Sequence, residues 1–275
     1  MLSGVTAVII SFNGGDQPGA CAESLSRQVD RIVIVDNGSD EVSRSRLRDA
    51  AADKDWEIVW LAKNLGIAAA LNIGLKIALE RGSPWMLTMD QDSLAAPDMM
   101  CAFSNLVAHE PAVACASPAL PGINPRGGGS TMRYAITSGN LVKTKVAEEV
   151  GGYWDDLFID GVDLDFSLRL KDAGHLIYRA PGAHIRHRLG DRASSIPFHS
   201  YHSPVRRYYI FRNYWALMAR HARGHLGFAI RRTVAHIFQF ATILLFGAQR
   251  RRSLSLIARG IGDAMRGRMG VLRAP

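Results

Sequence analysis

The sequence predicts an α/β fold with a mostly parallel sheet and helices on both faces. Three observations lead to this class. Apolar segments alternate with helical segments between residues 5 and 89, each of several apolar segments ends in a polar run, and 48% of the 275 residues are hydrophobic. Strands that alternate with helices are typical of parallel sheets. The length suffices for one large domain and a smaller appendage.

The first third of the chain contains four predicted strands and three predicted helices. The helix over residues 67–81 has apolar or small residues at helical spacing and stops at a Gly-Ser-Pro run. Ligands of such sheets bind beyond the carboxyl ends of the strands, so we expect the polar strand ends to share one edge. The predicted strands cover residues 5–13, 31–39, 56–61 and 85–89, and the other helices cover residues 18–28 and 43–53.

The rest of the chain is less regular. Residues 121–130 are rich in Gly and Pro and predict a mobile loop, and residues 133–143 predict a strand that crosses the first sheet. A helix over residues 163–173 should end near Gly174. Short strands are expected at residues 176–180 and 183–187, and helices at residues 208–223, 225–247 and 254–269.

Positive charge is concentrated in the C-terminal tail. Residues 201–275 contain 14 arginines and one acidic residue, a net charge of +13. Since the whole chain carries +8, residues 1–200 carry −5. Such asymmetry predicts an anionic partner surface, either a membrane or a nucleic acid. We expect no nucleic acid, because the tail lacks interleaved aromatic residues and the acidic clusters of the body would repel phosphates.

Two segments of the tail suit a membrane interface. Residues 233–247 are apolar, and this stretch is shorter than the ~20 residues that span a bilayer. Residues 254–269 form a basic amphipathic helix. With arginines flanking the apolar stretch, these segments are expected to lie on an anionic membrane. The alternative is that residues 233–247 pack on the main body or on a second subunit.

Cysteine usage and the N-terminus indicate a cytoplasmic protein. The cysteines, Cys21, Cys101 and Cys115, have no metal-binding spacing, so we interpret them as reduced thiols. The chain begins almost directly on an apolar strand without a basic-then-apolar leader, so a secretory signal is not expected.

Two carboxylates separated by one residue, Asp90 and Asp92, follow the apolar strand over residues 85–89. Mg²⁺ and Mn²⁺ prefer carboxylate oxygens and keep open positions for phosphate. This pattern predicts a metal–diphosphate site, with a plain surface turn as the alternative. One imidazole of His184 or His187 is a candidate to complete the metal shell; a structural histidine is the alternative.

Polar residues also follow the first two strands. The Asp36 carboxylate can accept hydrogen bonds from a ribose or a base, although Asp, Asn, Gly and Ser also favour turns and helix caps for local reasons. No G-x-G-x-x-G run follows the first strand, which excludes the dinucleotide fingerprint. The turn and small-residue helix over residues 64–74 would let a ligand approach the backbone closely, or would pack tightly on the sheet.

A second acidic cluster occupies residues 160–165, after the aromatic pair Tyr153 and Trp154. An aspartate here can deprotonate a hydroxyl as a general base. The alternative is a helix cap with acids that favour the helix N-terminus.

Together these motifs carry a family resemblance. They are Ser-Phe-Asn at 11–13, Val-Asp-Asn-Gly-Ser at 35–39, Asn-Leu-Gly-Ile-Ala at 64–68, Asp-Gln-Asp-Ser at 90–93, Thr-Ser-Gly-Asn at 137–140, Phe-Ile-Asp-Gly-Val-Asp at 158–163 and His-Arg-Leu-Gly at 187–190. Over roughly residues 4–215 the chain resembles family 2 glycosyltransferases with the GT-A fold. It is most similar to bacterial rhamnosyltransferases of O-antigen and other surface polysaccharides.

The resemblance implies inverting, metal-dependent transfer of L-rhamnose from dTDP-β-L-rhamnose, with Mg²⁺ or Mn²⁺ as cofactor. Asp163 matches the general base. Asp92, His187 and Asp90 match metal or diphosphate positions. The implied nucleotide-sugar residues are Ser11, Phe12, Asn13, Asp36, Asn37, Ser39, Asn64, Gly66, Asn72, Asp90 and Gln91. The implied acceptor side comprises Ser138, Gly139, Trp154 and Asp160.

The implied organisation is a GT-A catalytic domain over residues 1–200 and a basic helical extension over residues 201–275. The nucleotide-sugar half of the domain would cover about 1–95 and the acceptor half about 96–200. The implied acceptor is a polyprenyl-diphosphate-linked glycan, reached from the cytoplasm by peripheral binding to the inner face of the plasma membrane; a homodimer is left open.

The chain departs from many members of the family at two places. Val162-Asp163 replaces a Glu-Asp pair, as in the rhamnosyltransferase-like members, and a Gln-x-x-Arg-Trp motif is missing. The second absence, with the lack of multiple membrane spans, disfavours a processive polymerase. Transfer of galactofuranose or N-acetylglucosamine is the alternative among enzymes. A non-catalytic nucleotide-sugar sensor or a nucleic-acid-binding protein is the alternative from another class.

Overall fold

The computed structural model describes residues 2–119, 130–187, 202–247 and 249–273. The chain divides into two compact units. The first, here called the sheet unit, comprises residues 1–154 and 163–188, and the second, the tail unit, comprises residues 155–162 and 189–275. The segment of residues 155–162 thus belongs with the tail although it lies within the first 200 residues.

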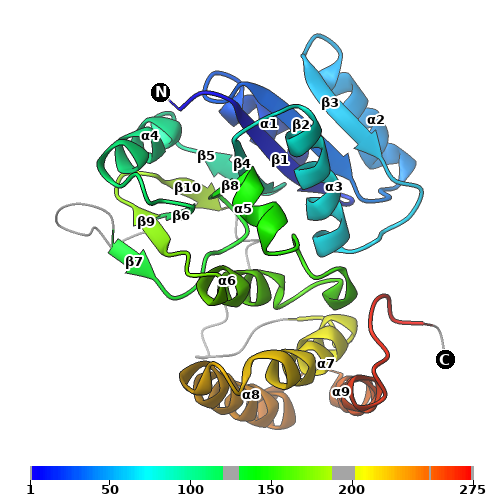
Figure 1. Cartoon of the computed structure of the whole chain (residues 1–275). Coiled ribbons are helices and arrows are strands. Elements are labelled where there is room, and N and C mark those ends of the chain that lie inside the picture. Colours follow the sequence, from blue (N-terminus) through cyan, green and yellow to red (C-terminus); the bar gives the residue numbers. More distant parts are fainter. Residues whose placement is uncertain (1, 120–129, 188–201, 248, 274–275) are drawn as a thin grey trace. The chain divides into compact units, whose positions relative to one another are not determined.

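The sheet unit is built on an eight-stranded mixed sheet in the order β3-β2-β1-β4-β8-β6-β9-β7 (Figure 1). Strands β3, β2, β1 and β4 are parallel, as predicted, whereas β8 is antiparallel to both β4 and β6. The strands are β1 Val5–Ser11, β2 Arg31–Asp36, β3 Trp56–Trp60, β4 Trp85–Asp90, β6 Cys115–Pro118, β7 Ser130–Met132, β8 Asn140–Lys143 and β9 Ile177–Ala180.

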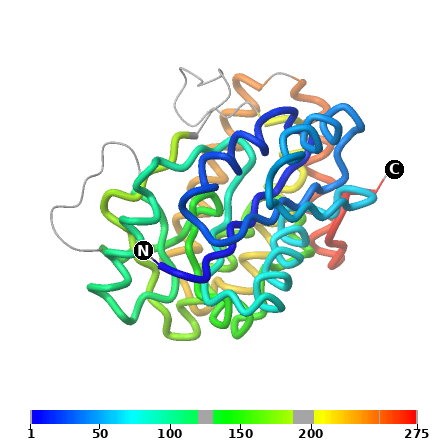
Figure 2. The backbone as a smooth tube through the Cα atoms, turned by 90° about the horizontal axis from the view of Figure 1, so that it is seen from above, coloured from blue at the N-terminus to red at the C-terminus, as the bar shows by residue number. Residues whose placement is uncertain are grey.

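Strand β1, which lies between β2 and β4, is buried over its whole length, and its dark-blue trace can be followed from the N-terminus in Figure 2. Such continuous burial is typical of a parallel strand that is covered on both faces. Helix α3 lies very close to it: a Cβ added to Gly74 would be 2.2 Å from Cγ1 of Val8. Tight helix–sheet packing therefore explains this glycine of the small-residue helix.

Among the described residues of the sheet unit, six helices flank the strands (Figure 1). Three of them follow the first three strands, as the alternating pattern predicts, and the predicted bounds differ from the observed ones by up to three residues. Helix α2 starts earlier than predicted because Asp40 caps it, its Oδ1 accepting from the Ser43 N–H at 2.8 Å. The helices are α1 Gln17–Leu25, α2 Glu41–Ala51, α3 Ile67–Glu80, α4 Met99–His109, α5 Thr144–Glu149 and α6 Val162–Asp172.

The predicted strand over residues 133–143 is wrong over most of its length. Only Asn140–Lys143 pairs in the sheet as β8, and residues 133–139 are irregular backbone that ends in a turn at Ser138 and Gly139. Gly139 has a φ of +76° and donates its N–H to the Thr88 carbonyl at 2.8 Å, so the chain enters the sheet abruptly. The predicted loop over residues 121–130 lies outside the described residues except for Ser130. The sequence also missed α4, α5, β6, β7 and the short strand β5, Ser93–Ala95.

A second, two-stranded sheet pairs β5, Ser93–Ala95, with β10, Ile185–His187, in antiparallel register. Ser93 is the register partner of His187. Residues that are almost a hundred positions apart in the chain are thereby brought together directly after the Asp90–Asp92 turn.

The described part of the tail unit contains the short helix η1, Asp155–Leu157, and three longer helices, α7 Pro204–His221, α8 Leu226–Phe246 and α9 Arg250–Met265. Helix α7 starts four residues before the predicted start, because Ser203 caps it and Pro204 occupies its first turn. The small apolar core of the tail unit consists of Ile210, Phe211, Ile243 and Ile257, with Ile261 packed against them.

Candidate active site

The ends of three parallel strands form one polar edge of the sheet, here called the polar edge. In register, Ser11 of β1 lies opposite Asp36 of β2, and Ile10 of β1 lies opposite Asp90 of β4. The Ser11 carbonyl also accepts the Asn37 N–H at 2.7 Å. The expectation that these polar ends share an edge is therefore confirmed.

Gln91, which lies between Asp90 and Asp92, connects this turn to the residue that follows β1. Its Oε1 accepts the Phe12 N–H at 2.8 Å, and its Nε2 donates to the Phe12 carbonyl at 3.2 Å. Next to this pair, a Cβ on Gly14 would lie 2.4 Å from the Gln91 Oε1, so glycine leaves the room that the amide uses. A nucleotide contact by Gln91 stays a prediction; its observed role is to fasten the turn.

The side chain of Asp36 is buried beneath the polar edge and does not lie on its surface. Its side chain is 1% exposed, and its Oδ2 accepts from the Arg44 Nε at 3.0 Å and from the Ser39 N–H at 3.2 Å. Burial with a cation and a backbone donor is the ordinary way to keep a carboxylate charged inside a protein. Arg44 also donates to the Leu61 carbonyl, so this ion pair joins β2 to the chain that follows β3.

Two asparagines shape the turn that precedes α3. The Asn37 Nδ2 donates to the Gly66 carbonyl at 3.1 Å, and its Oδ1 accepts the Leu65 N–H at 2.8 Å. The Asn64 Oδ1 accepts the Gly66 N–H at 2.9 Å. Gly66 has a φ of +92°, a conformation that favours glycine. The edge is thus held by its own amide side chains.

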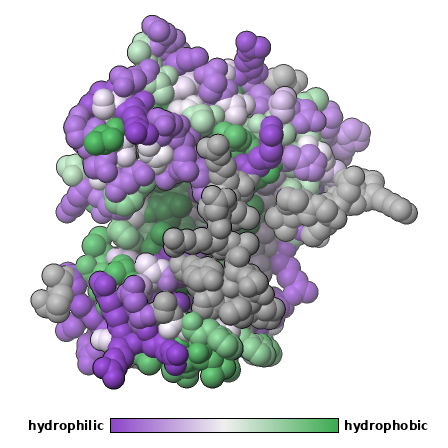
Figure 3. Space-filling view, turned by 180° about the vertical axis from the view of Figure 1, so that it is seen from behind, coloured by the Kyte–Doolittle hydropathy of each residue, from purple (hydrophilic) through white to green (hydrophobic). Residues whose placement is uncertain are grey.

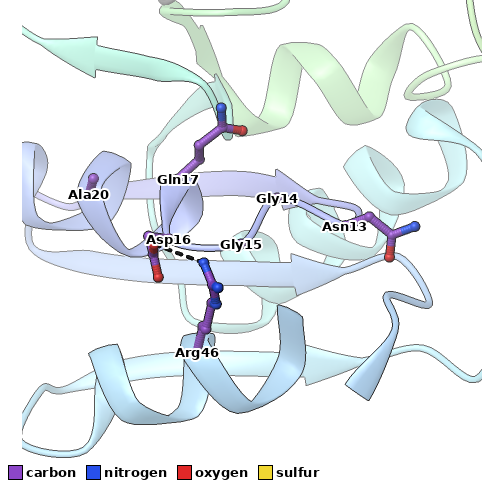
Figure 4. Close-up of a pocket in the computed structure, with 7 residues that line it drawn as sticks. All are labelled: Asn13, Gly14, Gly15, Asp16, Gln17, Ala20 and Arg46. Atoms are coloured by element: carbon purple, nitrogen blue, oxygen red, sulfur yellow. Dashed lines mark hydrogen bonds and ion pairs between the residues drawn. The ribbon is translucent and has the colours of Figure 1, made fainter. Parts of the chain in front are cut away.

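Phe12 and Asn13 occupy the loop that follows β1. Phe12 is 42% exposed, which makes it an aromatic surface at the polar edge. Asn13 has a φ of +50°, and its backbone N–H donates to the Ser39 Oγ at 2.9 Å. A hollow of about 420 Å³ extends from Asn13 along the loop to Arg46, which pairs with Asp16 at 3.0 Å (Figure 4).

Asp90 and Asp92 are both half-buried at the end of β4. Burial, and then the negative charges of Asp90 and Asp92, raise the pKa of the nearby Cys21 thiol far above its ordinary value. Ser138 lies behind this turn: its Oγ accepts the Asp90 N–H at 3.3 Å and donates to the Ser93 Oγ at 2.7 Å. Ser138, expected on the acceptor side, is placed against the carboxylate turn.

The backbone of His187 lies opposite Ser93, one residue after Asp92. The position of its side chain lies outside the described part of the structure. His184, three residues before His187, is exposed. Of the two candidate histidines, His187 is the one whose backbone is brought beside the carboxylate turn by strand pairing.

Asp163 lies in the first turn of α6, half-buried, with its Oδ1 accepting the Leu164 N–H at 2.9 Å. Two residues on, Asp165 is fully buried and pairs with Arg169 at 2.7 Å. Arg169 also donates to the carbonyls of Gly152, at 2.6 Å, and Val150. This pair was not singled out from the sequence, although its i,i+4 spacing of opposite charges was visible there.

Asn72 of α3 holds the backbone of Tyr153, in the segment that precedes α6. Its Nδ2 donates to the Tyr153 carbonyl and its Oδ1 accepts the Tyr153 N–H, both at 2.7 Å. The ring of Tyr153 in turn stacks on Phe166 of α6, with centroids 4.5 Å apart. Asn72, expected at the nucleotide, thus positions the segment that ends in Trp154. Its contact with a nucleotide stays a prediction.

This arrangement has known counterparts. The family model described as glycosyl transferase family 2 matches residues 6–159. The chain belongs to glycosyltransferase family 2. A dTDP-rhamnosyl transferase of Shigella flexneri, RfbF, is 30% identical over 248 residues, which cover 80% of this chain and 81% of that protein.

Two solved structures show that the glycosyltransferase has the GT-A fold. One is residues 1–349 of Staphylococcus aureus TarS in complex with UDP-GlcNAc, with a TM-score of 0.62, 13% identity, and coverage of 96% of this chain and 81% of that one. The other is the mannosyltransferase PcManGT of Pyrobaculum calidifontis in complex with GDP-Man and Mn²⁺, with a TM-score of 0.60, 18% identity, and coverage of 95% and 80%. The expected family and fold are confirmed.

Asp160 of the glycosyltransferase belongs to the tail unit, in the 155–162 segment. It has a φ of +65°, and its carboxylate forms a bidentate pair with Arg206, whose Nη2 lies 2.9 Å from Oδ1. The Asn213 Nδ2 lies 2.7 to 2.9 Å from the carbonyls of Leu157, Ile159 and Asp160. Residues of α7 therefore hold the backbone of the 155–162 segment in its conformation.

Arg212 is the largest fully buried side chain among the described residues, and it adds to this support. Its Nη2 donates to the carbonyls of Asp156 and Leu157, each at 3.0 Å, and its guanidinium lies over the ring of Tyr209 at 4.9 Å. From the sequence, Arg212 was noted only as one of the tail arginines, and Asn213 only as part of the predicted helix over residues 208–223. No local pattern marks them as support for a segment fifty residues earlier.

Proposed function

We propose that this glycosyltransferase moves L-rhamnose from dTDP-β-L-rhamnose to a hydroxyl of a lipid-linked glycan, with inversion at the anomeric carbon. The observation that carries the proposal is the carboxylate turn of Asp90 and Asp92 at the polar edge, beside the ends of β1 and β2. The sugar is proposed from the relative that is named a dTDP-rhamnosyl transferase and is 30% identical over most of both chains.

The donor nucleotide would occupy the polar edge. The exposed ring of Phe12 offers a flat apolar surface on which a base can stack. Asn13, Ser39 and the backbone around Asn64 and Gly66 supply polar groups for a ribose, in turns whose conformation is set by the asparagine bonds described above. Asp36 would act mainly by keeping this edge in shape, since its carboxylate is already bonded to Arg44.

The carboxylate turn fits a hard divalent cation. Asp90 and Asp92 supply carboxylate oxygens from one short turn, which are the ligands that such a cation prefers. The mannosyltransferase with the same fold was solved with Mn²⁺. Asp92 is proposed as the main ligand, with Asp90 and His187 as its companions. A bound Mg²⁺ or Mn²⁺ would offset the charge on the departing diphosphate.

Asp163 is proposed as the general base. Its carboxylate would accept the proton of the acceptor hydroxyl while that oxygen forms the new bond to the anomeric carbon of rhamnose. The bond from this carbon to the diphosphate breaks in the same step, and dTDP leaves. One displacement inverts the centre, so no nucleophile of the enzyme is required. Help of this kind contributes about 10²–10⁴-fold to the rate.

The acceptor is proposed to be a polyprenyl-diphosphate-linked glycan at the inner face of the bacterial plasma membrane, with the enzyme in the cytoplasm. The basic tail, with a net charge of +13 over residues 201–275, supports an anionic membrane as the meeting place. Trp154 and Asp160 are proposed on the acceptor side, together with Gly139.

The test is a panel of nucleotide sugars, each assayed for transfer or slow hydrolysis and for thermal stabilisation of the protein, with and without Mn²⁺. We expect dTDP-β-L-rhamnose to give the largest metal-dependent response. A larger response to UDP-galactofuranose or UDP-N-acetylglucosamine would contradict the sugar but retain the reaction. Stabilisation without any turnover, in the presence of membrane lipid extract, would favour a non-catalytic sensor.

A further inference from the structure

Helix α8 presents its apolar side to solvent. Of the described helices, it is the one that is long and apolar enough to cross a membrane by length and composition, yet 17% of its most apolar window is buried. Ordinary surface helices turn their apolar stripe inward. Here the exposed residues include Leu226, Ile230, Val234, Ile237, Phe238, Phe240, Leu244, Leu245 and Phe246, at 37% to 68% exposure.

Apart from Phe246 at the end of the helix, the exposed residues lie on one face. Ile230, Val234, Ile237 and Leu244 follow one another at spacings of three, four or seven residues, which places them in one row along the helix. The row from Leu226 to Leu244 is about 27 Å long at 1.5 Å per residue. Hydrophobic surface gathers over the helices of the tail unit at the lower edge of Figure 3.

The opposite face of α8 is the one that packs on α7, and it is partly polar. His236 is buried there, with its ring stacked on Tyr214 at 4.2 Å and its Nε2 3.5 Å from the Ile210 carbonyl. The Tyr214 hydroxyl lies 2.8 Å from the Thr233 Oγ1. Phe228 and Ile243 complete this inner face. On an ordinary surface helix the polar residues face water, whereas α8 turns polar groups toward α7 and apolar side chains toward solvent.

Helix α9 is the useful contrast within the same unit. Its residues toward α7 are close-packed: a Cβ on Gly260 would lie 2.7 Å from the Tyr208 carbonyl, and the Tyr208 hydroxyl donates to Asp263 at 2.9 Å. Ile257 is buried in the core of the unit. Its exposed side carries arginines. The apolar side of α9, which the sequence made a second candidate for the membrane, is covered by protein.

Positive charge borders the apolar face of α8. Arg223 lies before the helix, Arg231 lies on its exposed surface, and Arg250, Arg251 and Arg252 follow its end, all of them exposed. An apolar face bordered by arginines matches an interface of acyl chains and anionic headgroups. It does not match water, which would leave the face unfavourably hydrated.

We infer that the exposed face of α8 is a membrane-docking surface, on which the helix lies flat in an anionic interface and does not span it. Spanning would require α8 to leave α7, because His236 and Thr233 bond to α7 from the middle of the helix. This inference rests on the packing of α8 and holds whichever sugar the enzyme transfers.

The first experiment is flotation of the full-length protein with vesicles. Vesicles of phosphatidylglycerol and phosphatidylethanolamine should capture it, and vesicles of phosphatidylcholine alone should capture much less, because they lack anionic headgroups. In the double variant Ile237→Glu, Leu245→Glu, we expect capture to fall by about ten-fold or more, since two inserted apolar groups become charged.

The matched control is the double variant Val42→Glu, Leu176→Glu, which makes the same kind of change at exposed apolar positions of the sheet unit. It should bind vesicles like the unchanged protein. Thermal stabilisation by dTDP reports folding in both variants. Full vesicle binding by the α8 variant would overturn the inference.

A second experiment separates lying flat from spanning. After Cys101→Ser removes the exposed cysteine, Ile230→Cys and Leu245→Cys receive an environment-sensitive dye at opposite ends of the face. Depth-dependent quenchers in the vesicle should report equal, shallow depths for both positions. Unequal depths, with one dye at the bilayer centre, would contradict the flat orientation.

A second copy of the chain is the competing occupant of this face. Sedimentation of the lipid-free protein over a range of concentrations tests it. A dimer that the α8 double variant converts to a monomer, together with no vesicle binding by the unchanged protein, would overturn the membrane assignment in favour of a subunit interface.

Discussion

The polar edge and the 155–162 segment are both irregular backbone held in place by amide and guanidinium groups, but they take their support from different places. Gln91, Asn37 and Asp36 hold the polar edge from within the family 2 stretch at residues 6–159. The 155–162 segment is held by Arg212 and Asn213, far beyond that stretch. The polar edge is therefore supported by residues that lie near it in the first 160 residues, whereas the segment carrying Asp160 depends on side chains of α7, about fifty residues further along the chain.

The largest effect is expected from Asp163→Asn, which would separate binding from chemistry. Transfer should fall by about 10²–10⁴-fold, because the amide cannot accept the proton of the acceptor hydroxyl. Stabilisation by dTDP should remain, since the polar edge is unchanged. Steady-state rates and thermal shift measure the two. Asp53→Asn, an exposed aspartate after α2, is the control. Normal turnover of Asp163→Asn would remove this residue from the mechanism.

Asp92→Ala should show the reverse pattern, with the main loss in metal-dependent donor binding. We expect the affinity for dTDP in the presence of Mn²⁺ to drop by about ten-fold or more, toward the affinity of the unchanged protein in EDTA, because one carboxylate ligand is lost. Calorimetry with and without Mn²⁺ measures it. If Mn²⁺ strengthens dTDP binding equally in both proteins, the metal site lies elsewhere.

Asn213→Ala tests the support of the 155–162 segment. The carbonyls of Ile159 and Asp160 lose the Asn213 donor, whereas the Leu157 carbonyl keeps its bond from Arg212. We therefore expect the tail unit to be destabilised by about 1–3 kcal/mol. Amide exchange at Ile159 and Asp160 should become faster, and the KM for the acceptor should rise while dTDP binding stays constant. Asn105→Ala, at an exposed position of α4, is the control. A rise in the dTDP Kd instead would show that the two regions share their support.

A smaller effect is expected at the junction of Gln91 and Gly14. Gln91→Ala removes two hydrogen bonds in a partly exposed turn, and we expect a loss of about 1 kcal/mol in donor binding. Gly14→Ala should weaken donor binding similarly, because its Cβ would displace the Gln91 Oε1. In the double variant the second change should add nothing, which a double-mutant cycle detects. Full additivity would show that Gly14 acts without Gln91.

The smallest effect concerns pH and lies in the tail unit. Burial, with the charge of Arg232, holds the pKa of His236 below its ordinary 6.5. The unfolded chain then binds a proton more readily than the folded one, so the contribution of His236 to stability is present above about pH 6.5 and is lost as the pH falls below it. Chemical denaturation at pH 5 and pH 8 measures this. His236→Gln should reduce the pH dependence; an unchanged dependence would assign it to another group.

Much of the polar edge could be predicted because it depends on regular elements. Periodicity placed the strands that end at Asp36 and Asp90, and parallel strands necessarily bring their carboxyl ends to one edge. The roles of Gln91 and Asn72 could not be predicted, because an amide bonds equally well to a ligand and to backbone. The turn before Asn140 was also missed, since its geometry follows from Gly139 and from the Thr88 carbonyl on another strand.

By itself, the sequence determined the family, the fold and the order of the strand ends, because hydrophobic period and motif spacing are properties of the chain alone. Only the tertiary structure decided which partner each polar side chain takes and which face of each tail helix is covered. Periodicity tells which residues share a face, but the neighbouring element decides whether that face is inside. Packing on α7 covers the apolar side of α9 and leaves the apolar side of α8 exposed.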